Sequence, residues 1–130
     1  MAKRFLLDTD VVVEYLRGSK QAIAFLEKLE GSVFLSVITV AELFAGVSGT
    51  EERQSVDQFL QAFHIIPIDE ELAKEGCLYR KEFFPSHGVG LADALLAATA
   101  DRVHATFVTF NRRHFPMLKD IKVPYKRRDH

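Results

Sequence analysis

The chain has 130 residues, of which 48% are hydrophobic and 27% are charged. These ordinary globular values exclude a disordered chain and favour one domain over residues 1–130. The 17 Lys and Arg residues against 18 Asp and Glu residues give a net charge of −1, so the chain is not a general polycation and any contact with nucleic acid must be local.

The first half of the chain alternates short apolar runs with helical patterns. Residues 5–7 are predicted to form a buried strand that stops at Asp8, and residues 33–35 a second strand. Apolar residues at helical spacing predict four helices in this half, over residues 11–17, 19–31 (with Ser19 as the cap), 39–47 and 51–63.

Two prolines in the middle of the chain, Pro67 and Pro85, constrain the predicted elements there. Residues 65–68 are predicted to form a short strand, and Pro67 favours an edge position for it. Asp69 is expected to cap a helix that ends immediately before Pro85. Residues 86–90 are expected to form a flexible loop.

The last third begins with an alanine-rich helix over residues 91–103, whose small side chains would let it lie close to a sheet. Residues 106–109 are predicted as a fourth strand and residues 121–123 as a last short one, in a basic tail that is irregular from about residue 125. Strands that alternate with helices predict an α/β fold, with a parallel sheet of about four to five strands and helices on both faces.

Cys77 is the only cysteine, which excludes an internal disulfide and a C-x-x-C zinc site and favours a reducing compartment. We expect Cys77 to be a small buried apolar residue rather than a nucleophile. The chain has no run of about 18 apolar residues that could span a membrane, and its first residues turn acidic at Asp8, too early for a signal peptide. We therefore expect a cytoplasmic protein.

Polar residues follow the predicted strands at the edge where open α/β sheets bind ligands. Asp8 ends the first strand, Glu42 lies one to two turns into the helix after the second, and Asp93 lies in the first turn of the alanine-rich helix. Asn111 follows the fourth strand. Taken alone, each acid could be a helix cap or a solvated side chain. Together they are expected to meet at one edge of the sheet.

The three carboxylates would repel one another and raise each other's pKa values. Glu42 and Asp93 have apolar sequence neighbours, which is unusual for carboxylates. A hard divalent cation removes this conflict, and oxygen-only ligands suit Mg²⁺ or Mn²⁺. The sequence therefore predicts a metal site at Asp8, Glu42 and Asp93, and such a metal suggests phosphate chemistry.

Basic residues concentrate near the C-terminus. They outnumber acidic ones by seven to one between residues 112 and 128, a local charge of +6, and they are Arg112, Arg113, Lys119, Lys122, Lys126, Arg127 and Arg128. Arg112 and Arg113 follow Asn111 directly and are predicted to bind substrate at the rim of the site. Residues 126–128 are equally compatible with a solvated, partly frayed tail.

Four blocks of the sequence together resemble the PIN-domain nucleases and, within them, the VapC-type toxins of toxin–antitoxin pairs. The blocks are residues 5–11, 36–43, 90–100 and 107–115, so the resemblance covers nearly the whole chain. It implies a three-layer α/β/α PIN domain and an endoribonuclease. Asp8, Glu42 and Asp93 would bind Mg²⁺ or Mn²⁺, and a metal-activated water would attack the RNA phosphodiester. Asn111 would contribute a neutral oxygen.

The same resemblance implies a homodimer and a VapB-type antitoxin that covers the site, often with a basic side chain placed among the acids. One position departs from the family pattern. Many members have a fourth acid three residues after the asparagine, where this chain has His114. We interpret His114 as a rim residue without a catalytic role, although it could act on the leaving group or a phosphate.

Two alternatives stay open at this point. The missing fourth acid would fit a catalytically silent PIN module that binds RNA or protein, although such a module gains nothing from a negative pocket. The Asp8-Thr9-Asp10 motif also fits a haloacid-dehalogenase-type phosphatase, with Asp8 as the nucleophile and Asp10 as the acid/base. The later acidic pair of that family is absent, because Asn111, Arg112 and Arg113 stand there.

Overall fold

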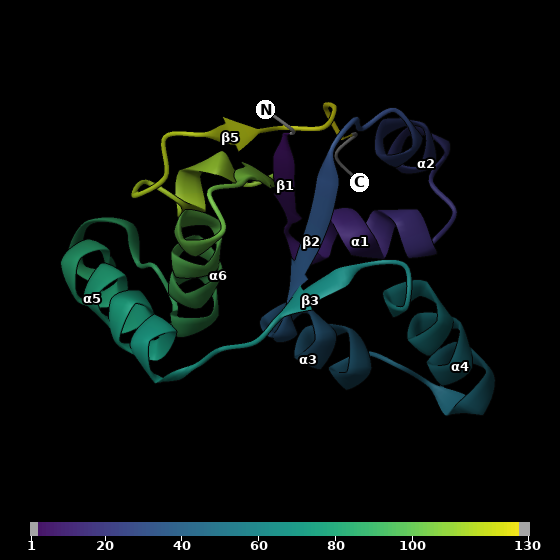
Figure 1. Ribbon diagram of the computed structural model, residues 1–130, viewed down its shortest axis with the longest axis horizontal. Coiled ribbons are helices and arrows are strands. Elements are labelled where there is room, and N and C mark those ends of the chain that lie inside the picture. Colours follow the sequence, from purple (N-terminus) through teal and green to yellow (C-terminus); the bar gives the residue numbers. More distant parts are fainter. Residues whose placement is uncertain (1–2, 128–130) are drawn as a thin grey trace.

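The computed structural model describes residues 3–127 and contains a five-stranded parallel sheet in the order β3-β2-β1-β4-β5 (Figure 1). The strands are β1 (Arg4–Leu7), β2 (Ser32–Ser36), β3 (His64–Ile66), β4 (Thr106–Val108) and β5 (Ile121–Lys122). The predicted α/β fold and strand number are confirmed. The strand before Pro67 is at an edge, as expected, and ends one residue before the proline. Arg128 of the basic tail lies outside the described residues.

Helices cover both faces of the sheet, which confirms the predicted three layers (Figure 1). They are α1 (Thr9–Leu16), α2 (Lys20–Glu27), α3 (Val37–Ala45), α4 (Gly49–Leu60), α5 (Glu70–His87) and α6 (Leu91–Arg102), with a 3₁₀ turn η1 (Arg112–His114). The predicted caps are present, since Ser19 accepts a hydrogen bond from Ala22 N and Asp69 accepts one from Leu72 N. None of the helices within residues 3–127 is long and apolar enough to cross a membrane.

The central strand β1 supplies both cores. Its side chains alternate between the two faces because a strand has a period of two. Phe5 and Leu7 pack with residues of α1, α3 and α4, whereas Leu6 packs with the alanine-rich α6. The core under α6 also contains Phe107 and Phe115, whose ring centroids lie 4.5 Å apart. The burial of β1 on both faces fixes the position of Asp8, the residue that follows it.

The helix α5 does not stop at Pro85, so this prediction was wrong. Pro85 lies inside the last turn, and the helix continues to His87. Gly88 then adopts the left-handed conformation (φ 64°) and donates from its N–H to Phe84 O at 2.8 Å, a common way to end a helix. The loop expected over residues 86–90 is correspondingly shorter, and Val89 within it is buried.

Cys77 is exposed, which corrects the expectation that it is buried. The buried position is its neighbour Gly76, which faces α6: a Cβ added there would lie 2.6 Å from Leu95 Cδ2. One residue along a helix turns the side chain by about 100°. Cys77 therefore points away from the contact between α5 and α6.

Candidate active site at the carboxyl end of the sheet

The candidate site lies between β1 and β4, where the connections that leave the two strands run to opposite sides of the sheet. From β1 the chain continues outward to β2 and β3, whereas β4 and β5 lie on the other side of β1. In open parallel sheets such a switch point, at the carboxyl ends of the strands, forms the ligand crevice. Asp8 follows β1 and Thr109 follows the adjacent β4, so both predicted strand ends open into this crevice.

Asp8 is a buried acid held by two hydrogen bonds. Its Oδ1 accepts from Thr9 N at 2.8 Å and so caps α1, and its Oδ2 accepts from Thr109 Oγ1 at 2.7 Å. The Thr109 hydroxyl in turn accepts from Asn111 N at 3.0 Å. The expected cap role and a site position therefore coexist in one side chain, and Thr109 connects Asp8 to the segment after β4.

The pKa of Asp8 is raised to about 7, first by burial and then by the negative charges of Asp10 and Asp93. The hydrogen bonds from Thr109 and Thr9 act in the opposite direction and limit the shift. Only 8% of Asp8 is exposed, so water does little to stabilise its charged form. A bound cation would therefore stabilise the charged form of Asp8 more than it would stabilise the charged form of a solvated acid.

Glu42 joins the same edge through α1. Its Oε1 accepts from Thr9 Oγ1 at 2.6 Å, and that hydroxyl also lies 3.0 Å from the hydroxyl of the buried Thr39. Glu42 is exposed despite its apolar sequence neighbours. The buried positions of α3 are Thr39 and Leu43, four residues apart on one face, and Glu42 lies beside this face.

Asp93 lies in the first turn of α6 with its side chain 34% exposed. Burial raises the pKa of Asp93, His114 opposes the shift, and Glu42 adds to it. The His114 Nδ1 lies 3.8 Å from Asp93 Oδ2, so the histidine that replaces the expected fourth acid stands directly beside an acid of the site. His114 itself is exposed, as a rim position requires.

Asp10 also belongs to the site, although the sequence pattern predicts a role for it only in the phosphatase alternative, as the acid/base. Its Oδ2 accepts from Asn111 Nδ2 at 3.0 Å, whereas its Oδ1 is buried without a hydrogen-bond partner among residues 3–127. Burial raises the pKa of Asp10, and the positive charge of Arg127 opposes this. The spacing of two residues from Asp8 was a usable signal, and so were the hydroxyls of Thr9 and Thr109, which directly follow Asp8 and β4.

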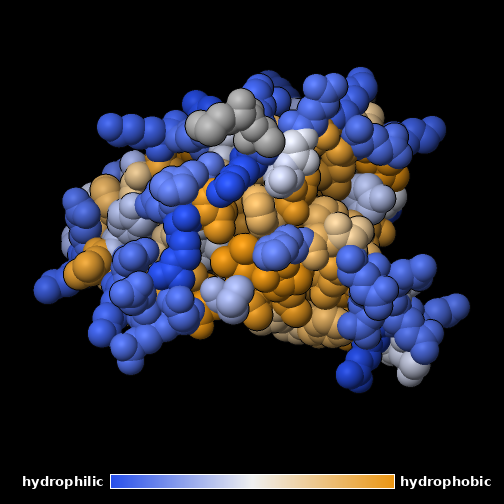
Figure 2. Space-filling view, viewed as in Figure 1, coloured by the Kyte–Doolittle hydropathy of each residue, from blue (hydrophilic) through white to orange (hydrophobic). Residues whose placement is uncertain are grey.

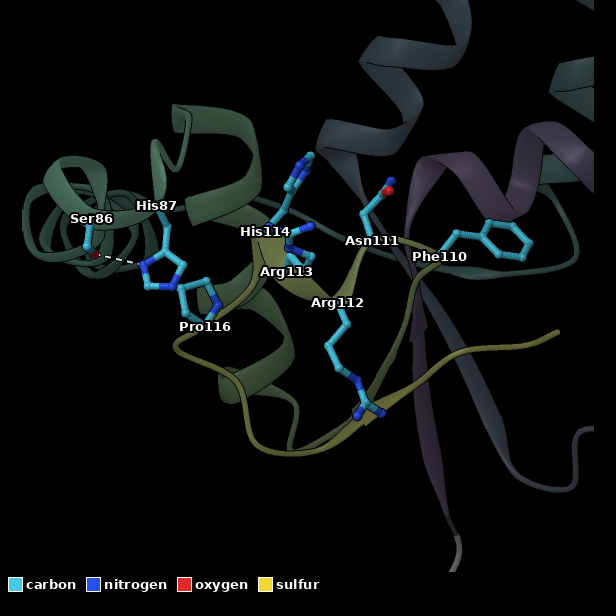
Figure 3. Close-up of a pocket in the computed structure, with 8 residues that line it drawn as sticks. All are labelled: Ser86, His87, Phe110, Asn111, Arg112, Arg113, His114 and Pro116. Carbon is cyan, nitrogen blue, oxygen red and sulfur yellow. Dashed lines mark hydrogen bonds between the residues drawn. The ribbon is translucent and has the colours of Figure 1, made fainter. Parts of the chain in front are cut away.

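A hollow with a volume of about 870 Å³ lies around η1 (Figure 3), and its lining residues Asn111 and His114 reach Asp10 and Asp93 of the site. Its lining combines basic, aromatic and polar side chains: Ser86, His87, Phe110, Asn111, Arg112, Arg113, His114 and Pro116. Figure 3 shows Arg112 pointing away from Asn111, and its Nη2 donates to Ile121 O at 3.4 Å. Both predicted rim arginines therefore line this hollow, with Arg112 turned toward β5.

The predicted metal ligands share one edge of the sheet, but no group of three or more His, Cys, Asp or Glu side chains within residues 3–127 has the geometry to hold an ion. Glu42 is bound to Thr9, and Asp93 stands beside His114. The donor chemistry nevertheless suits a hard divalent cation, since the groups at this edge are carboxylates, and the charged forms of Asp8 and Asp93 are disfavoured by burial and by neighbouring acids.

The sequence of residues 5–120 matches the family described as PIN domain. The chain belongs to the PIN-domain family. It is similar to Ribonuclease VapC10 of Mycobacterium tuberculosis, 36% identical over 123 residues that cover 92% of each chain. It is also similar to Ribonuclease VapC19 of the same organism, 35% identical over 124 residues that cover 92% of this chain and 98% of that protein.

The PIN fold of this chain resembles that of a solved toxin–antitoxin complex from Klebsiella pneumoniae. The TM-score is 0.81 at 26% identity, covering 93% of this chain and 98% of the other. The resemblance to PIN-domain nucleases and VapC-type toxins is thus confirmed. Membership in the PIN-domain family also removes the support for the haloacid-dehalogenase-type alternative.

Proposed function

We propose that this PIN-domain protein is an Mg²⁺- or Mn²⁺-dependent endoribonuclease toxin that a VapB-type antitoxin neutralises. The observation that carries the proposal is the buried Asp8 at the switch point of the sheet, with Asp93, Glu42 and Asn111 brought to the same edge. The similar proteins named ribonucleases support the reaction class.

In this proposal Asp8, Glu42 and Asp93 hold the metal. When bound, the metal would supply an activated water and stabilise the charge that develops on the phosphate. The chain itself positions the ligands: Thr109 and the N–H of Thr9 fix both oxygens of Asp8. A carboxylate held in this way loses little freedom when it binds an ion.

Asn111 would contact the reacting phosphate or the metal through its amide oxygen, because its amide nitrogen is engaged by Asp10. Arg112 and Arg113 would bind flanking phosphates from the hollow, where exposed guanidinium groups suit a polyanion that the acids alone would repel. RNA is the proposed substrate, and the cytoplasm is the proposed compartment.

A second hollow of about 360 Å³ between α1, α3 and α4 is the proposed antitoxin groove. It is mainly apolar, with Glu42 at its edge, and its lining is Val13, Leu16, Arg17, Glu42, Leu43, Gly46, Val47, Glu52, Ser55 and Val56. An antitoxin segment in this groove would cover Glu42 and so block the metal site. The similar complex from Klebsiella pneumoniae supports a partner of this kind.

We also propose a homodimer. Figure 2 shows apolar residues gathered in the middle of one face, over the region where β2, β3 and α3 lie in Figure 1, with hydrophilic residues around them. Val37, the first residue of α3, is among the exposed large apolar side chains. A contiguous apolar surface rimmed by polar residues is typical of a protein interface.

The direct test is cleavage of a structured RNA pool by the purified protein with Mg²⁺ or Mn²⁺, against EDTA and against Asp8→Asn and Asp93→Asn. Metal-dependent cleavage that both variants lose would support the nuclease. A catalytically silent binding module is the second candidate, favoured by His114 at the fourth acid position and by the unassembled ligand set. RNA binding without cleavage and without metal binding by calorimetry would favour that module.

A further inference from the structure

The C-terminal segment (residues 125–127) folds back onto the residue that follows Thr109. The Phe110 ring contacts it twice: the Tyr125 ring packs edge-on at 5.0 Å, and the Arg127 guanidinium carbon lies 4.3 Å from the ring centroid. The Tyr125 hydroxyl also lies 3.2 Å from Ser19 Oγ, at the start of α2. Three contacts thus fix a segment that the basic composition alone would leave frayed.

These contacts place a cation at the edge of the acidic site. Phe110 stands between Thr109, which bonds Asp8, and Asn111, which bonds Asp10. Arg127 lies over Phe110, within electrostatic range of Asp10. Arg112 and Arg113, by contrast, lie on η1 and line the large hollow. The acids are therefore flanked by arginines from two separate segments.

The contact with Phe110 leaves Arg127 able to bind a second group. A cation–π contact uses the charge of a guanidinium and not its N–H donors, and these donors match the oxygens of a phosphate. Arg127 is exposed, so its donors can reach a ligand. The contact with Phe110 also limits the number of conformations that the Arg127 side chain must lose on binding.

We propose that the C-terminal segment is a substrate-binding element, in which Arg127 contacts a backbone phosphate of the RNA next to the scissile one. The proposal rests on the proposed ribonuclease function. It distinguishes Arg127 from the neighbouring Lys126, which is exposed and carries the same charge. The alternative is a purely structural role, in which Arg127 only holds residues 125–127 against Phe110.

The test compares Arg127→Ala with Lys126→Ala, a matched control that removes one positive charge from the next position. A labelled single-stranded RNA oligonucleotide of mixed sequence is titrated in EDTA at several salt concentrations. We expect Arg127→Ala to weaken binding about threefold and to reduce the salt slope by about one, as loss of one phosphate contact should, whereas Lys126→Ala should leave the salt slope unchanged. Lys126→Ala is expected to change affinity less than about twofold.

Equal effects of the two variants would overturn the proposal, and so would a lower melting temperature of Arg127→Ala with unchanged RNA binding. Tyr125→Ala loosens the segment without changing its charge and should weaken binding in the same direction; unchanged binding there would refute the anchoring role. Wild-type cleavage is measured in parallel. If the wild type cleaves RNA and Arg127→Ala binds RNA as tightly as the wild type, this inference alone is refuted. If the wild type neither binds nor cleaves RNA, the ribonuclease function is refuted as well.

Discussion

The two ends of the sheet each carry a hydrogen-bonded pair of an aspartate and a threonine, and the two aspartates differ in their exposure to solvent. At the amino end of β4, Asp120 is exposed and accepts from Thr106 Oγ1 at 2.9 Å. At the carboxyl end of β1, Asp8 accepts from Thr109 Oγ1 at 2.7 Å but is buried, with a pKa raised to about 7. The same acid–threonine pair is a solvated surface contact at one end and a destabilised charge at the other. The difference indicates that the carboxyl end is shaped for a ligand rather than for stability.

The largest expected effect is on the rate of RNA cleavage, which should depend on Asp8 and not on Asp120. Asp8→Asn should reduce metal-dependent RNA cleavage at least about 100-fold, a loss of roughly 2.7 kcal/mol of transition-state stabilisation. Asp120→Asn should stay within about twofold of wild type. Initial cleavage rates on one RNA substrate measure both. Equal rates for the two variants would remove the functional distinction between the ends of the sheet.

Asp8→Asn should also stabilise the fold. The folded-state pKa of Asp8 lies above its usual value of 3.8, so its protonated form favours folding below about pH 4, and this contribution is lost as the pH rises through 7. The variant should therefore match the wild type near pH 4 and exceed it above pH 7 by at least about 1 kcal/mol. Denaturant unfolding in EDTA at both pH values measures this. A variant less stable than wild type at pH 8 would contradict the account.

Gly31→Ala tests the amino end of the sheet, where we expect a substitution to change the stability of the fold and not the cleavage reaction. Gly31 has φ +148°, and an added Cβ would lie 2.3 Å from the Lys3 carbonyl oxygen. That oxygen accepts from Ser32 N at 2.9 Å, so it cannot move without loss of the contact. We expect a loss of about 2 kcal/mol in unfolding free energy. Cleavage rates measured well below the melting temperature should be unchanged, and a selective loss of activity would contradict this.

Asp10→Ala should lower the cleavage rate about tenfold, or roughly 1.4 kcal/mol, because it releases the amide of Asn111. Asp10→Asn is the matched control, since its amide oxygen can still accept from Asn111 Nδ2. The side-chain amide resonances of Asn111, followed by NMR, should change in the alanine variant and persist in the asparagine variant. Equally reduced rates in both variants would show that the site uses the charge of Asp10 and not its hydrogen bond, and wild-type rates in both would contradict any role for Asp10.

The smallest effect concerns the exposed cations of the hollow. Replacing Arg112 and Arg113 by Ala should weaken RNA binding about fivefold and flatten its salt dependence, with little change in stability. The control removes two exposed lysines from the amino end, Lys28 and Lys119. Anisotropy titrations at three salt concentrations compare the two double variants. An identical salt slope in both would place the RNA elsewhere on the molecule.

Local patterns in the sequence were sufficient to predict the strands and most of the helix ends. The strand before Asp8 and the caps Ser19 and Asp69 depend on neighbouring residues, and all three appear as expected. The proline in α5 was misjudged because the helix tolerates it in its last turn and ends at Gly88, where the backbone can turn left-handed.

Contacts between distant residues could not be predicted in the same way. Asn111 and Asp10 are 101 positions apart, and only the pairing of β1 with β4 brings them together. The exposure of Glu42 depends on which face of α3 meets the core, which its apolar neighbours did not reveal. The assignment of Asp8, Glu42 and Asp93 to a metal remains a prediction.

Calorimetric titration with Mn²⁺ of the wild type, Asp8→Asn and Asp120→Asn tests the central claim most directly, because it requires no knowledge of the RNA target. We expect saturable binding to the wild type and to Asp120→Asn, and loss of binding in Asp8→Asn. Binding that Asp8→Asn retains, or no binding to the wild type at millimolar Mn²⁺, would contradict a metal site at the carboxyl end of the sheet.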